Sequence, residues 1–268
     1  MKKTLISAQL FGAAMLVSLG SNAQIFDDSE MIHIPAGKFT MGCNHDDCVG
    51  DDVPAHKVKL KGFYIDKYEV TFRRYKLCVE KGDCSEPMIG GSCNWEYPAW
   101  HDDHPVNCVD FKQAESLCKS EGKRLPTEAE WEKAARGVDG RKFPWGSEPP
   151  TCDHVVMDPN GLEKPQPGCG RGTSQPVYHG EGTGDSPYGV VGMSGNMWEW
   201  TSDNYDPEYY KNSPKSNPTG PWIGYGLKTV RGGGFTMRTP AELTTTLRFG
   251  YSPEGEGYLL GIRCAMDE

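Results

Sequence analysis

The sequence predicts an α+β domain with few helices, short strands and much irregular backbone. Three observations indicate this class. Three segments have helical periodicity and are each followed by a glycine, the other apolar runs are short, and residues 138–228 are dense in Gly, Pro, Asn and Asp. In a compact domain, so long an irregular region has to be held by something other than a sheet. We expect disulfides, bound ions or buried Trp side chains to hold it.

Helices are expected at residues 71–81, 110–121 and 127–136. In the first of them, Phe72, Tyr75 and Cys78 share one face, as in an amphipathic helix. The third opens with Thr127 and has Glu130 three residues later, which is the spacing of a capping box. A glycine directly follows the last periodic residue of each segment, where it favours the end of a helix.

Short strands are expected at residues 31–35, 57–65, 229–231 and 261–264. Residues 57–61 alternate Lys-Val-Lys-Leu-Lys, as a half-buried strand should. The sequence shows no repeat of solenoid period and no low-complexity tract. A single domain over residues 24–268 is therefore the simplest organisation.

The first residues differ in character from the rest. Lys2 and Lys3 form a basic start, residues 5–19 form an apolar stretch, and Ser-Asn-Ala at 21–23 supplies small residues. This is the pattern of a secretory signal peptide, which we assign to residues 1–23. The apolar stretch is too short to span a bilayer comfortably. We therefore expect a periplasmic or secreted protein that no membrane anchors.

The charge balance excludes one class of partner. The chain carries 28 Lys and Arg against 37 Asp and Glu, a net charge of −9, and loss of the two leader lysines would make it −9 − 2 = −11. An acidic chain without a Lys- or Arg-rich run has no electrostatic footprint for nucleic acid or an anionic membrane surface. We expect neither as a partner.

All 10 cysteines lie beyond residue 23. An even number of cysteines in an exported chain indicates disulfides rather than thiolate metal sites. No C-x-x-C pair occurs, so zinc is not expected. Cys43 with Cys48, and Cys78 with Cys84, would close small loops. The spacing leaves the partners of the other six cysteines open.

Eight motifs occur in order along the chain: IPAGKFTMG at 34–42, YEVT at 68–71, HPVNCV at 104–109, GKRLPTEAEWE at 122–132, FPWG at 143–146, GNMWEWT at 195–201, VRGG at 230–233 and GIRC at 261–264. Together they resemble the formylglycine-generating enzyme, or sulfatase-modifying factor, family. The resemblance covers residues 31–266. It implies a C-type-lectin-like fold with small sheets, few helices and much irregular backbone.

The resemblance also implies a disulfide framework. Relatives join the position of Cys118, on the inner face of the helix expected at 110–121, to the cysteine of the terminal Gly-x-Arg-Cys motif, here Cys264. The pairs that would remain are Cys93 with Cys108 and Cys152 with Cys169.

The family's oxidative chemistry depends on two cysteines that follow the paired glycines and bind copper(I). The corresponding stretch here, residues 234–250, contains no cysteine. Soft thiolates select copper(I), and the lone soft side chain in the stretch, Met237, is the kind that usually packs. We therefore expect no copper and no formylglycine-generating activity.

Calcium is the cofactor that the resemblance favours. By position, its ligands would be Gly195, Met197 and Glu199, with Gly192 standing where many relatives have Asn. Backbone carbonyls and one carboxylate suit a hard cation. The alternative is that Glu199 only accepts hydrogen bonds from neighbouring groups.

A second calcium site of the family corresponds to residues 153–171. Here Cys169 stands where an acidic ligand is expected, and Cys152 lies next to the first ligand position. A disulfide between them would tie the two loop segments that a metal ties in relatives.

Other reactive side chains have plainer explanations. The run from His101 to His104 has the composition of a metal cluster, but successive residues of an extended strand point to opposite faces. Ser194 lacks the Gly-x-Ser-x-Gly turn of a nucleophile. Glu242 lies within the stretch that lacks the cysteines and is a candidate acid or base, or else an exposed loop carboxylate.

Two functions remain open. The first is a non-catalytic binding protein that neutralises a periplasmic toxin, as an immunity protein does, or assists a secretion or signalling complex. The second is a periplasmic enzyme of altered chemistry, for example in siderophore maturation, that uses Glu242 and Arg248. The missing cysteines favour the first function, a binding protein, and therefore a protein as its partner. The aromatic residues expected to anchor that partner are Tyr205, Tyr209, Tyr210, Trp222 and Tyr225.

Overall fold

The structure, a computed structural model, describes residues 27–46, 48, 50–96, 102–161 and 164–268. The predicted signal peptide lies outside these residues, as does His101. The described helices are α1 (Phe72–Lys81), α2 (Phe111–Ser120) and α3 (Glu128–Arg136), with short 3₁₀ turns η2 (Tyr209–Lys211) and η3 (Pro240–Leu243). None of the helices in the described ranges is long and apolar enough to cross a membrane.

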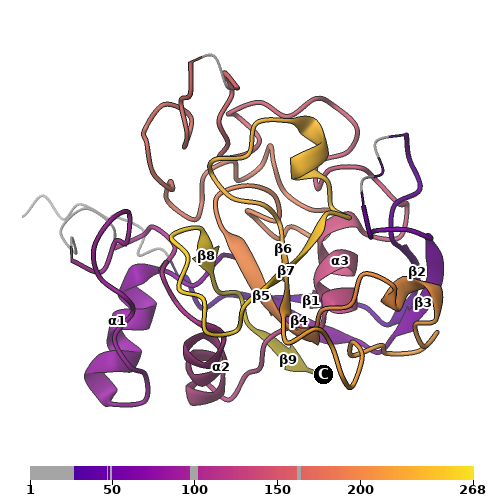
Figure 1. The fold of residues 1–268 in the computed structure, drawn as a ribbon, viewed down its shortest axis with the longest axis horizontal. Helices are drawn as coiled ribbons and strands as arrows, with labels where there is room; N and C mark the ends of the chain where they lie inside the picture. Colours follow the sequence, from indigo (N-terminus) through magenta and orange to yellow (C-terminus); the bar gives the residue numbers. More distant parts are fainter. Residues whose placement is uncertain (1–26, 47, 49, 97–101, 162–163) are drawn as a thin grey trace, which may run out of the picture.

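In the described residues, three small sheets make up the β structure (Figure 1). The first contains β1 (Met31–Ile34), β4 (Phe63–Asp66) and β9 (Ala265–Asp267), in that order. The second pairs β2 (Gly37–Met41) with β3 (His56–Leu60). The third has the order β7 (Arg248–Tyr251), β6 (Lys228–Arg231), β5 (Trp198–Asn204) and β8 (Leu260–Gly261). The predicted class, small sheets with few helices, is confirmed.

The helices begin where the sequence signals predicted. The Thr127 side chain accepts a hydrogen bond from the Glu130 backbone N–H, and Glu130 reaches back to the N–H of Thr127, which completes the capping box of α3. Asp110 and Gln113 form the same box at the start of α2. Helix α3 packs against β5 and β6 on one side and against β2 and β3 on another, so it joins two of the sheets (Figure 1).

Two strand predictions were wrong in their extent. The run at 57–65 divides at Lys61-Gly62 into β3 and β4, which pair with different partners and belong to different sheets. Of the run at 261–264, only Gly261 lies in a strand, β8, and β9 begins after the run, at Ala265. An apolar run reports burial, whereas strand limits depend on partners that lie far away in the sequence.

All five implied disulfides form: Cys43–Cys48, Cys78–Cys84, Cys93–Cys108, Cys118–Cys264 and Cys152–Cys169. No cysteine is left as a thiol. Part of the irregular region is held in the way the sequence suggested. Cys152 and Cys169 pack against a small core that includes Phe143, and the rings of Phe143, Trp145 and His154 stack in series.

Candidate functional site

A pocket of about 420 Å³ has three main walls. They are strand β7, residues 237–247, which follow the paired glycines, and residues 257–260. Strand β7 supplies one wall because side chains alternate along a strand: Phe249 and Tyr251 both line the pocket. Trp198, at the start of β5, stands against Phe249 with their ring centroids 6.0 Å apart. The remaining lining residues are Val230, Met237, Glu242, Leu247, Gly257, Tyr258, Leu259 and Leu260.

Glu242 brings the single carboxylate to this lining. Its Oε2 accepts hydrogen bonds from the backbone N–H of Arg238 at 3.0 Å and of Thr239 at 2.8 Å, and from the Thr239 hydroxyl at 2.9 Å. Burial acts to raise the pKa of Glu242, but these hydrogen bonds outweigh it and the pKa falls below its ordinary value. Glu242 is thus an anion at neutral pH, which suits electrostatic binding better than proton transfer.

The stretch that resembles the copper-binding segment of the family forms part of this pocket, through Met237, Glu242, Leu247 and Phe249. All ten cysteines of the chain are held in disulfides elsewhere. The pocket therefore presents apolar surface and one carboxylate where thiolates would be required for copper(I).

Arg248 lies on the opposite face of β7 from the pocket. Its guanidinium is buried, with Nε 2.8 Å from one carboxylate oxygen of Glu128 and Nη1 3.2 Å from Asp51, and it contacts the ring of Tyr210. The structure therefore does not bring Arg248 together with Glu242. Side-chain alternation along β7 turns Arg248 into the core, whereas Glu242 lines the pocket.

Glu199 sits among buried hydrogen-bond donors. Arg263 Nη2 lies 2.7 Å from Oε1, Arg263 Nε lies 3.0 Å from both oxygens, and Trp131 Nε1 lies 2.6 Å from Oε2. These donors occupy both oxygens, and the guanidinium already neutralises the charge. In this arrangement Glu199 does not fit as a calcium ligand, and the alternative that it only accepts hydrogen bonds describes its geometry.

A second buried acid lies beside this ion pair. Glu69 accepts a hydrogen bond from the Asn196 side-chain amide at 2.6 Å and from the Met197 backbone N–H at 3.1 Å. Burial and the negative charge of Glu199 raise the pKa of Glu69 to about 8, against the opposing effect of Arg263. The hydrogen bonds of Glu69 thus fix the backbone of the GNMWEWT motif. The raised pKa keeps Glu69 largely uncharged at neutral pH, so the charge of Arg263 is balanced by Glu199.

The comparisons with known proteins agree with this architecture. The model of the sulfatase-modifying factor enzyme 1-like domain matches residues 18–268. The chain belongs to this family. The formylglycine-generating enzyme of Bos taurus is 30% identical over 89% of this chain and 75% of its own length. The inactive Cα-formylglycine-generating enzyme 2 of Mus musculus is 26% identical over 89% of this chain and 86% of its own length.

Solved structures show the same fold. That of PvdO from Pseudomonas aeruginosa is 25% identical, covers 89% of this chain and 94% of its own, and superposes with a TM-score of 0.73. The crystal structure of CarF, at 19% identity and a TM-score of 0.63, covers 90% of this chain and 98% of its own. The resemblance stated from the motifs is confirmed at the level of family and fold.

Within the family fold, the remaining predicted side chains are structural or scattered. Ser194 is buried and donates to the carbonyl of Leu243 at 2.8 Å. His104 Nδ1 lies 3.1 Å from the Ser174 hydroxyl. Of the aromatic residues expected at an interface, Tyr210 is buried in the core, whereas Trp222 is 95% exposed. The prediction for Tyr210 was wrong because its ring packs beneath Arg248.

Sequence reasoning missed the pocket itself. Its walls come from β5, β6, β7, residues 237–247 and residues 257–260, segments that only the folded chain brings together. One local signal was available: Phe249 and Tyr251 are two residues apart in a short strand, which places both rings on one face. The loop that carries Cys43, His45 and Cys48 was also missed as a group, since it was interpreted only as a disulfide.

Proposed function

We propose that this protein of the formylglycine-generating enzyme family is a binding protein that makes no formylglycine. The observation that supports it is the composition of the 420 Å³ pocket. The stretch that carries two thiols in relatives here supplies an apolar wall and one carboxylate. A volume in the range of about 300–1,000 Å³ is typical of ligand pockets. Its aromatic walls and single polar group are also typical of them.

The chemistry of the pocket walls indicates which kind of group would bind there. The rings of Trp198, Phe249 and Tyr258 favour an aromatic or branched apolar group, which they can surround and shield from water. The carboxylate of Glu242 favours a positive charge next to that group. A side chain such as Phe, with a Lys or Arg beside it on a partner protein, satisfies both conditions.

The signal-peptide pattern would place the partner in the periplasm or outside the cell. A toxin that the protein neutralises, or a component of a secretion or signalling complex, meets this condition. An enzyme of altered chemistry, as in siderophore maturation, would have to act without Arg248, which lies on the opposite face of β7.

The binding test uses two blocked dipeptides as probes, acetyl-Phe-Lys-amide and acetyl-Phe-Glu-amide, titrated into residues 24–268 by calorimetry. We expect the lysine probe to bind more tightly. Phe249→Ala should weaken both probes about tenfold, since one aromatic wall that the probe covers contributes on the order of 1.5 kcal/mol. Glu242→Gln should remove the preference for lysine. Trp222→Ala, an exposed site outside the pocket lining, is the control.

Equal weak binding of both probes to the wild type and to Phe249→Ala would overturn the pocket as the binding site. The second half of the proposal has its own assay. A cysteine-containing sulfatase peptide incubated with the protein, copper and oxygen should give no aldehyde. Conversion of that peptide, or turnover of a siderophore precursor that disappears in Glu242→Ala, would show an enzyme instead.

A further inference from the structure

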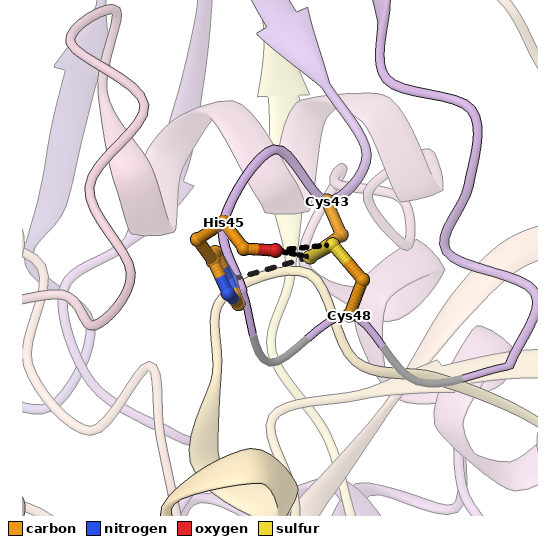
Figure 2. A group of neighbouring side chains, drawn as sticks. All are labelled: Cys43, His45 and Cys48. Atoms are coloured by element: carbon orange, nitrogen blue, oxygen red, sulfur yellow. Dashed lines mark hydrogen bonds between the residues drawn. A yellow bond between two sulfur atoms is a disulfide. The ribbon is translucent and has the colours of Figure 1, made fainter.

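Cys43, His45 and Cys48 gather in one small loop at the surface, away from the pocket described above. One ligand atom from each lies within 4.8 Å of the others. Cys43 is buried, whereas His45 and Cys48 are partly exposed. Figure 2 shows the imidazole of His45 beside the disulfide, with a dashed line that joins its ring nitrogen to Cys43 Sγ.

The distances within this loop suit a tetrahedral metal site. His45 Nε2 lies 3.4 Å from Cys43 Sγ. At zinc bond lengths of about 2.0–2.1 Å to nitrogen and about 2.3 Å to sulfur, tetrahedral angles separate these two atoms by about 3.6 Å. The Cα atoms of Cys43 and Cys48 are 5.5 Å apart, within reach of two sulfurs bound to one ion. Four residues separate the two cysteines, a spacing that occurs in zinc sites.

The loop is fixed by contacts that do not involve the disulfide. Arg136, at the end of α3, donates to the carbonyl of Gly42 at 2.6 Å and to the side chain of Asn44 at 2.7 Å. The backbone N–H of Cys43 donates to the carbonyl of Asp52 at 2.7 Å. These bonds hold the chain on both sides of Cys43, so Cys43 and the adjoining His45 keep their places when the disulfide opens, and the four intervening residues keep Cys48 within reach.

A surface hollow of about 470 Å³ gives access to the loop, with His45 in its lining. Cys48 is the more exposed of the two cysteines, so an external thiol would reach it first. Three protein ligands leave one tetrahedral position for water, as in zinc sites with an open position.

We propose that Cys43, His45 and Cys48 form a redox-gated site for a thiophilic divalent cation. The site binds Zn²⁺ once a dithiol has reduced the disulfide. A first thiolate of the dithiol attacks Cys48 Sγ, forms a mixed disulfide and releases Cys43 as a thiolate. The second thiolate attacks the mixed disulfide, which releases Cys48 and leaves the dithiol as a cyclic disulfide. Two electrons pass to the protein, two protons pass to solvent, and Zn²⁺ neutralises both thiolates.

The chain contains its own matched control. Cys78–Cys84 closes a loop of similar length, with a sequence separation of 6 against 5, and likewise joins a buried to a partly exposed sulfur. The residues between Cys78 and Cys84 are Val, Glu, Lys, Gly and Asp, without a histidine. The inference therefore concerns the added imidazole and not small disulfide loops in general.

The experiment reduces residues 24–268 with dithiothreitol at the lowest concentration that lets Cys43 and Cys48 be alkylated, as read by peptide mass spectrometry. The reductant is removed without oxygen, and Zn²⁺ alone is added and measured by elemental analysis after gel filtration. We expect one Zn²⁺ per chain after reduction and none before it. His45→Ala keeps the disulfide and should lower the zinc affinity at least tenfold. Cys78→Ala/Cys84→Ala should bind zinc as the wild type does.

Two results would overturn the proposal. One is reduced protein that binds zinc equally well with His45 or Ala at that position, which would indicate non-specific thiol binding. The other is a Cys43–Cys48 disulfide that stays closed until Cys118–Cys264 opens. Because His45→Ala removes no disulfide, the comparison stands even if Cys43→Ala/Cys48→Ala does not fold.

Discussion

Arg263 and Glu199 form a fully buried ion pair, with Arg263 Nη2 2.7 Å from Glu199 Oε1. The pair joins β5 to the C-terminal segment, 64 residues later in the chain. Arg263 also donates to the carbonyls of Asp66 and Val191 at 3.0 and 2.8 Å. The Arg263 guanidinium thus connects the C-terminal segment to three others. Glu199 is the carboxylate that neutralises its charge.

Glu199→Gln should lower the free energy of unfolding by about 3–5 kcal/mol, because it leaves the Arg263 charge buried without its counter-ion. Urea denaturation monitored by circular dichroism measures this. Glu208→Gln, which breaks an exposed pair with Lys211, should change stability by at most about 0.5 kcal/mol.

The same variant tests the calcium expectation. Since Arg263 already occupies the carboxylate, a chelator should leave the melting temperature of the wild type unchanged. A chelator that lowers the melting temperature of the wild type and not that of Glu199→Gln would show that Glu199 holds calcium after all.

Removal of the Cys118–Cys264 disulfide by alanine at both positions should cost about 5 kcal/mol, since it closes a loop with a sequence separation of 146. The corresponding change at Cys43 and Cys48, with a separation of 5, should cost about 2 kcal/mol by the same loop-entropy relation. Equal losses in denaturant titrations would contradict this origin of the stability.

The titration of Asp203 should lower the stability of the protein as the pH rises from about 4 to 7. Burial and the charge of Glu128 raise the pKa of Asp203 to about 7 in the folded state, against an ordinary value of 3.8. The folded state therefore holds a proton that the unfolded state has lost, and the free energy of unfolding falls with pH across this window, by up to about 4 kcal/mol. Asp203→Asn should flatten the profile; an unchanged slope would assign it to another group.

Gly195→Ala should destabilise the protein by about 3 kcal/mol or more. Gly195 has a φ of +69°, and an added Cβ would lie 2.3 Å from both the Val155 side chain and the Val156 carbonyl. Gly182, with a φ of +82° and nothing within 4 Å of the added atom, is the matched control. Its alanine variant should lose only about 1 kcal/mol, the cost of the left-handed backbone. Thermal melts that rank the two variants equally would contradict the steric argument.

The features that sequence predicted are local or carried by long motifs. The capping box from Thr127 to Glu130 involves neighbouring residues, and the pairing of Cys118 with Cys264 came with the resemblance. The features it missed depend on distant partners. Nothing near Glu199 in the chain indicates that Arg263 will occupy it, and nothing in residues 57–65 indicates that Gly62 separates two sheets. The pocket needs several distant segments at once, so only the alternation of side chains along β7 could have suggested it.

The Cys118–Cys264 disulfide also determines what a protease can do to this molecule. A single backbone cut in the long irregular region between these residues leaves two fragments that are still joined by a covalent bond. Such a nicked chain would keep its mass under non-reducing electrophoresis and separate only after reduction. The segments with the least regular structure are therefore also those whose cleavage releases nothing.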